Sequence, residues 1–143
     1  MELLLEQCAN LTIENDRKHI DWYNNTIWEL HARTTVDGED HVNTNSFIGN
    51  GNYIGALEGE RKYAWEVLPA PYIVWVTDEL VIDCTEKPRC ILAMVRESHY
   101  DGLEANCEWF KYVLDGELKF GLFAKKDIQP HEELIGRYQV SYY

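Results

Sequence analysis

The pattern of apolar and polar positions divides the chain into a helical start and a β-rich remainder. Near the N-terminus, apolar residues recur at helical spacing at Ile20, Tyr23, Ile27 and Leu30. Neither Gly nor Pro interrupts residues 1–33, and this spacing is typical of one face of an amphipathic helix. We therefore predict a helical N-terminal segment.

The pattern changes after residue 33. Residues 34–52 are polar and rich in Gly and Asn, which predicts a loop with a short strand. Short apolar runs bounded by turn residues then predict strands at 52–60, 63–67, 72–76 and 80–83. The last two of these are expected to pair as a hairpin. The apolar run at 89–99 is too brief to assign to a strand or a helix.

The clearest local signal is an aromatic hairpin near the C-terminus. CEWFKYVL (107–114) and ELKFGLFA (117–124) flank an Asp-Gly dipeptide, which supplies the positive φ angles of a two-residue hairpin turn. A proline-containing turn at 127–131 and a last strand, ELIGRY (133–138), are predicted to follow.

These elements define a fold class that is mainly β with an N-terminal helical segment. A length of 143 residues favours a single domain with a substantial core. We expect one structural unit, made of a helical segment with an acidic loop (1–45) and a β domain (46–143). The aromatic fraction of 13% suits a small β-rich core or an aromatic-lined channel.

The net charge of -12 narrows the choice of partners. It repels phosphate backbones and anionic membranes, so we expect neither direct nucleic-acid binding nor a membrane surface as partner. A Lys/Arg-rich peptide would be attracted to the domain. The alternative is that the acidity only keeps the protein soluble.

Metal binding is not predicted. The four cysteines include no C-x-x-C pair, so the ligand spacing of a zinc site is missing. His131, Glu132 and Glu133 are ligand types in a row, but consecutive strand side chains point to opposite faces and cannot share one ion. The N-terminal stretch lacks the cationic start of a signal peptide, so we expect an intracellular protein with reduced thiols.

The order of the C-terminal segments resembles the end of a known fold. DIQPHEELIGRY (127–138) is similar to the phrase that ends SET methyltransferase domains, particularly their PR branch, with His131 in place of the usual Gly. GNYIGALEGE (51–60), VID (81–83) and the E-x-N of 104–106 resemble upstream motifs of the family. The resemblance covers about residues 48–142 and implies small β-sheets with a C-terminal pseudoknot.

The resemblance also implies a chemistry. SET enzymes transfer a methyl group from S-adenosylmethionine to a lysine amine held in a narrow channel. By this resemblance Tyr138 is the catalytic tyrosine, and Tyr142 and Trp109 line the substrate channel. The partner implied is a basic peptide such as a histone tail, or a protein of a chromatin complex, and the location implied is the nucleus.

Several cofactor positions depart from the family pattern. The implied cofactor-binding positions are Arg96, Glu97 and Asn106, but Arg96 and Glu97 replace the family's Asn-His pair. The usual Gly-x-Gly loop is not recognisable around residues 32–41. Gly136 is also unusual for the family, and its missing side chain is expected either to open the pocket wall or to mark a bulge in the strand.

Three functions follow from this pattern. The first is a PR/SET-like chromatin or transcription regulator that binds a protein partner and has weak or lost activity. The second is an active lysine methyltransferase. The third is an unrelated small β domain with coincidental motif matches, because a fold by itself does not settle a function.

Overall fold

The computed structural model describes residues 21–98 and 102–138. Short strands and two 3-10 turns make up its elements: β1 (Trp22–Tyr23), β2 (Leu30–Thr34), β3 (Asp40–Thr44), β4 (Tyr53–Ala56), β5 (Glu60–Tyr63), η1 (Ala64–Glu66), β6 (Ile73–Trp75), β7 (Leu80–Asp83), β8 (Arg89–Cys90), η2 (Ile91–Met94), β9 (Arg96–Glu97), β10 (Cys107–Leu114), β11 (Glu117–Ala124) and β12 (Ile135–Tyr138). The class is therefore mainly β, as predicted.

The largest sheet has the strand order β4-β11-β10-β12-β9. Its centre is the long β10–β11 hairpin, which pairs from Cys107–Ala124 to Leu114–Glu117. Asp115 and Gly116 form the turn with φ angles of 52° and 77°, the conformation that an Asp-Gly turn supplies. The predicted hairpin is confirmed in both its strands and its turn.

The last strand lies inside this sheet. β12 is inserted between β9 and β10 and runs parallel to both. This confirms the predicted final strand, and it is the placement that a C-terminal pseudoknot requires. The threading of the pseudoknot itself stays a prediction.

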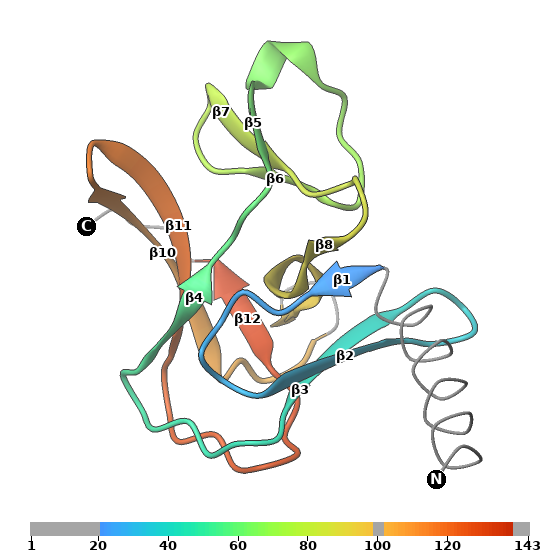
Figure 1. Ribbon diagram of the computed structural model, residues 1–143, viewed down its shortest axis with the longest axis vertical. Helices are drawn as coiled ribbons and strands as arrows, with labels where there is room; N and C mark the ends of the chain where they lie inside the picture. Colours follow the sequence, from blue (N-terminus) through green and yellow to red (C-terminus); the bar gives the residue numbers. More distant parts are fainter. Residues whose placement is uncertain (1–20, 99–101, 139–143) are drawn as a thin grey trace, which may run out of the picture.

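Three smaller sheets surround the largest one (Figure 1). β5, β7 and β6 form an antiparallel sheet that stands as a lobe at the top of Figure 1. The β2–β3 hairpin lies below β1 in the same view, and the short strands β1 and β8 pair in parallel. The hairpin predicted from the runs at 72–76 and 80–83 is thus confirmed as β6 and β7.

The hydrophobic core joins the sheets into one body. Its fully buried members come from several strands, from η2 and from the loops between elements, and include Val42, Ile54, Ile82, Leu92, Leu122 and Leu134. Burial of such aliphatic side chains is the main favourable contribution to folding. Within the described residues, no helix has the length and apolar character needed to cross a membrane.

The predicted N-terminal helix is wrong wherever it can be checked. Residues 22–33 contain two strands and a turn. In β2, Leu30 and Ala32 are buried whereas the residues between and after them are exposed, the period of a strand. Ile27, which fits the helical spacing, is 95% exposed. The remainder of the predicted helix, residues 1–20, lies outside the described residues, and the predicted division at residue 45 stays a prediction.

A second local prediction is also wrong. Residues 63–67 are expected from their composition to form a strand, but Ala64–Glu66 form the 3-10 turn η1. Only Ala64 of this turn is buried, and the Trp65 side chain is 72% exposed. The apolar composition of the run therefore reflects surface aromatics and not a buried strand. The ambiguous run at 89–99 contains β8, η2 and β9.

Candidate functional site

Three aromatic rings from three strands form one wall of a cavity. The parallel register of β10 and β12 sets Trp109 beside Tyr138. The Phe120 ring of β11 stacks on the Trp109 ring at a centroid distance of 4.8 Å and on the Tyr138 ring at 5.5 Å. The cavity that they border has a volume of about 570 Å³. The two positions that the resemblance places in a lysine channel, Trp109 and Tyr138, thus come together.

The other walls of this aromatic cavity are mostly apolar. β6 contributes Ile73 and Trp75, and the segment around η2 contributes Leu92 and Val95. Among the described residues that line the cavity, Glu97 is the only charged one. A single carboxylate therefore faces a largely apolar and aromatic surrounding.

The carboxylate of Glu97 is incompletely bonded. Its Oε1 atom accepts a hydrogen bond from the Trp109 indole N–H at 3.1 Å. Its Oε2 atom is buried and has no hydrogen-bond partner at standard distance among the described residues. Burial raises the pKa of Glu97 to about 7, although the Trp109 indole and the backbone N–H of Tyr138 act to lower it. Desolvation disfavours the charged form of the carboxyl group, and here its effect on the pKa outweighs that of the two hydrogen bonds.

Gly136 makes the contact between Trp109 and Glu97 possible. A Cβ atom at this position would lie 2.8 Å from the Trp109 indole nitrogen and 3.4 Å from Glu97 Oε1. The first distance is too short for any real side chain, so the indole occupies the space over β12 that a larger residue would fill. The absence of a side chain at 136 therefore does not widen the pocket, because Trp109 fills the gap.

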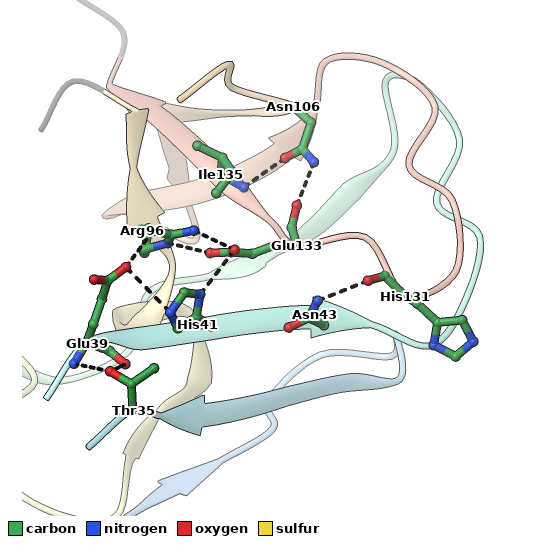
Figure 2. A network of polar contacts seen from close by, with 9 residues as sticks. All are labelled: Thr35, Glu39, His41, Asn43, Arg96, Asn106, His131, Glu133 and Ile135. Atoms are coloured by element: carbon green, nitrogen blue, oxygen red, sulfur yellow. Dashed lines mark hydrogen bonds and ion pairs between the residues drawn. The ribbon is translucent and has the colours of Figure 1, made fainter. Parts of the chain in front are cut away.

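Arg96 points away from this cavity, because neighbouring strand residues face opposite sides. Its guanidinium makes two hydrogen bonds to the Glu133 carboxylate, at 2.6 and 2.7 Å. A third nitrogen bonds to Glu39 at 2.5 Å. His41 of β3 contacts Glu133 at 3.1 Å and Glu39 at 3.4 Å. Figure 2 shows these four residues, here called the ion-pair cluster, converging between β3, β9 and the start of β12.

In the cluster the two carboxylates are matched by a guanidinium and an imidazole as their partners. Desolvation alone would raise the pKa of Glu133, but hydrogen bonds from Arg96 and His41 lower it below its ordinary value. The Arg96 and Glu133 side chains are only 18% and 19% exposed, so neither charge could easily find water in place of its partner. Sequence reasoning missed Glu39 and His41, which lie far from Arg96 and Glu133 in the chain.

Asn106 is committed to the backbone of the last strand. Its side-chain amide donates to the Glu133 carbonyl oxygen at 2.7 Å and accepts from the Ile135 N–H at 2.8 Å (Figure 2). Asn106 is 4% exposed, so both ends of the amide are satisfied by protein. In this structure it anchors β12, and its predicted contact with a cofactor stays untested.

Tyr142 and His131 are the two other positions that the resemblance singles out. Tyr142 lies outside the described residues. His131 sits in the turn before β12 with a positive φ of 74°, the conformation that the family's Gly adopts without strain. In the part of the chain that the structure describes, no group of three or more His, Cys, Asp or Glu side chains could hold a metal ion.

A second hollow lies where the resemblance places a cofactor. It has a volume of about 400 Å³ and is bordered by Gly38 and Glu39 of the β2–β3 turn, by Tyr72 and by Arg96. Its lining mixes polar and apolar residues, and Glu39 and Arg96 on its border already bind each other.

Comparison with known proteins identifies the fold. No family model and no curated protein sequence matches the chain. A solved structure does match: the crystal structure of the ATXR5 SET domain in complex with histone H3 dimethylated on R26. The TM-score is 0.66 at 21% identity, over 96% of this chain and 67% of that chain. The chain has a SET-domain fold.

The SET fold makes the cofactor position testable. SET-domain methyltransferases use S-adenosylmethionine, and the resemblance assigns one contact to a neutral Asn at position 96. An Asn amide both donates and accepts, whereas Arg96 is a fixed cation with donors only, and it is bound by Glu133 and Glu39. Two carboxylates near this position, Glu133 and Glu39, are therefore engaged with Arg96. These residues do not fit the cofactor in the family's manner.

Proposed function

We propose that this domain is a SET-fold binding module for a basic peptide, and that its methyl-transfer activity is weak or lost. The observation that carries the proposal is the Arg96 guanidinium, held between Glu133 and Glu39. A cofactor with a cationic sulfonium would have to compete with Arg96 for these two carboxylates.

The partner class follows from charge and from the aromatic cavity. A net charge of -12 attracts Lys/Arg-rich segments over distances set by the ionic strength. A cavity of about 570 Å³, in which Glu97 is the only charged residue among the described lining, offers a place for one cationic side chain. A histone tail or a basic segment of a chromatin-complex protein has this chemistry, which suits a PR-like transcription regulator in the nucleus.

Calorimetry with the full chain tests the proposal. We expect no saturable heat from S-adenosylmethionine or its demethylated product, and we expect binding of a Lys/Arg-rich peptide that weakens as salt is added. A dissociation constant below about 100 μM for either cofactor form would overturn the loss of cofactor binding. Absence of any peptide binding would overturn the module.

One observation favours the alternative function, an active lysine methyltransferase. Tyr138 lies in the aromatic cavity beside Trp109 and Phe120, where the resemblance places a channel hydroxyl. Transfer of labelled methyl groups from S-adenosylmethionine to histone tails measures this directly. If transfer occurs, Tyr138→Phe should reduce it about 10²-fold or more without changing cofactor affinity. An equal rate in the variant would exclude a catalytic role for the Tyr138 hydroxyl.

A further inference from the structure

A second aromatic surface lies on the face of the β10–β11 hairpin opposite to the aromatic cavity. Because neighbouring strand residues point to opposite faces, Phe110 and Phe123 lie on this outer face, whereas Trp109 and Phe120 line the cavity. The outer face contains a hollow of about 390 Å³. This outer groove is bordered by Glu108, Phe110, Lys111, Tyr112, Phe123 and Lys125. It shares no described lining residue with the aromatic cavity.

The Phe123 ring is the centre of a fixed cluster of aromatic rings. Its centroid lies 5.4 Å from that of Phe110, 5.1 Å from that of Tyr53 and 6.3 Å from that of Tyr112. The Tyr53 and Tyr112 hydroxyl groups share a hydrogen bond of 2.8 Å, so each satisfies the polar end of the other ring. The Tyr112 ring also covers Gly121, where a Cβ atom would lie only 2.6 Å from it. The apolar wall of the groove is therefore formed before any ligand arrives, which lowers the entropic cost of binding.

The rings of this cluster remain open to solvent. Phe110, Tyr112 and Phe123 are half-buried, and Tyr53 is 44% exposed. Contiguous exposed aromatic surface of this kind marks interaction sites, and Tyr and Phe are enriched in the cores of protein interfaces. The groove is therefore suited to an apolar side chain of a partner.

The charges at the groove have the opposite sign to the protein as a whole. Among the described lining residues Glu108 is the only acidic one, and it is contacted by two cations, Arg137 and Lys125, the latter at 3.5 Å. The Glu108 side chain is 15% exposed, whereas those of Lys125 and Arg137 are 30% and 56% exposed. The groups that a ligand can reach at this edge are therefore positive, on a chain whose net charge is -12.

We propose that the outer groove binds an acidic peptide segment of a partner protein, with one Phe, Leu or Trp side chain of the peptide seated against Phe110 and Phe123. Asp or Glu residues beside that anchor pair with Lys125 and Arg137. The inference goes beyond the proposed function, because it assigns a second partner whose charge is opposite to that of the first. The domain would then join a basic and an acidic chain through the two faces of one sheet.

A single-stranded nucleic acid shares part of this chemistry but fits less well. It carries one negative charge on every nucleotide, and a net charge of -12 repels such a chain over its whole length. The Phe110 and Tyr112 rings also meet Phe123 nearly edge-on, at 75° and 78°, so they do not present parallel faces on which successive bases could stack. A few carboxylates around one apolar anchor match the groove better.

The test selects short random peptides from a displayed library on the immobilised full chain. An excess of a free Lys/Arg-rich peptide is present throughout, so that the basic-peptide site of the proposed function is occupied. We expect the enriched sequences to combine Asp or Glu with Phe, Leu or Trp. The most enriched peptide is then synthesised and titrated by calorimetry into the full chain and its variants.

A charge-matched pair of variants locates the binding site. Lys125 and Lys126 are chain neighbours that contact Glu108 and Glu104 respectively, but of the two only Lys125 borders the groove. Lys125→Glu should weaken binding of the enriched peptide about tenfold. Lys126→Glu makes the same change in net charge and should weaken it less than about threefold.

An apolar pair of variants tests the anchor. Phe110 and Leu114 lie on the same face of β10, but of the two only Phe110 borders the groove. Phe110→Ala should weaken binding about tenfold or more, and Leu114→Ala less than about twofold. The thermal midpoint of each variant shows whether it is folded, and the lysine pair decides the location of the site if Phe110→Ala is not.

The outcomes separate this inference from the proposed function. Enriched sequences without acidic residues, or equal weakening by Lys125→Glu and Lys126→Glu, would overturn the inference and leave the basic-peptide module intact. A dimer in sedimentation that dissociates in Phe110→Ala would overturn it by showing a second copy in the groove. Tighter binding of a single-stranded oligothymidylate than of the enriched peptide would overturn it in favour of nucleic acid. Failure of the Lys/Arg-rich peptide to bind would overturn only the proposed function.

Discussion

Arg96 and Glu97 are neighbours on β9, but their side chains lie in opposite electrostatic surroundings. The charged side chain has charged partners on one side of the strand and lies among apolar and aromatic residues on the other. The Arg96 side holds two carboxylates, a guanidinium and an imidazole that contact one another. The Glu97 side holds one carboxylate, with one oxygen unsatisfied among the described residues, in an aromatic cavity. In the matched cluster the charged groups already have partners, so little is left for a ligand to contact. An unmatched charge can still bind one. We therefore attribute a stabilising role to one side and propose a binding role for the other.

The largest expected effect comes from breaking the matched side. Glu133→Ala removes the carboxylate that bonds two nitrogens of the Arg96 guanidinium in a mostly buried position. We expect the free energy of unfolding to fall by about 2–3 kcal/mol, measured by urea denaturation. Glu132→Ala, which removes an exposed neighbour, should cost less than about 1 kcal/mol. Equal losses in the two variants would contradict a stabilising role for the cluster.

A somewhat smaller effect is expected where β12 meets Trp109. Gly136→Ala places a Cβ atom 2.8 Å from the indole nitrogen, and such overpacking typically costs about 1–3 kcal/mol. The loss should shrink when the same change is made in a Trp109→Phe background, because the smaller ring leaves room. A double-mutant cycle of unfolding free energies measures this coupling, and strictly additive effects would argue against the clash.

The smallest effect concerns the unmatched side and takes the form of a dependence on pH. Glu97 has a folded-state pKa of about 7 against an ordinary value of 4.5. Between these values the folded protein keeps a proton that the unfolded chain releases, so stability falls as the pH rises through this range. Glu97→Gln should remove that fall, raising the thermal midpoint by a few degrees at pH 8 and leaving it unchanged at pH 4.5. A parallel pH profile in both proteins would contradict it.

The sequence predicts the β10–β11 hairpin to the residue because its information is local. An Asp-Gly turn fixes the register of both strands. The N-terminal prediction is wrong because helical spacing assigns Ile27 to a buried face, whereas the fold exposes this residue. The side chain of Asn24 accepts a hydrogen bond from the Thr26 N–H at 3.0 Å, a turn that Asn favours and that helical spacing alone ignores.

The candidate site is predictable only in part. The family resemblance locates Arg96, Glu97 and Tyr138, because each lies in or beside a motif. It does not indicate that Arg96 pairs with Glu133, 37 positions away, or that His41 reaches Glu133 across 92 positions. Such partners are set by the tertiary fold and carry no local signal.

The position of β12 in the sheet determines when, during folding, the two faces of β9 are completed. Although it is the last of the described strands in chain order, it lies between two earlier ones. During synthesis from the N-terminus, β9 and β10 therefore lack the strand that pairs with both of them until β12 has been made. Insertion of that strand brings Glu133 to Arg96 and Tyr138 to Trp109 in a single event. The two faces of β9 are thus completed together, and a chain stopped before β12 would lack both.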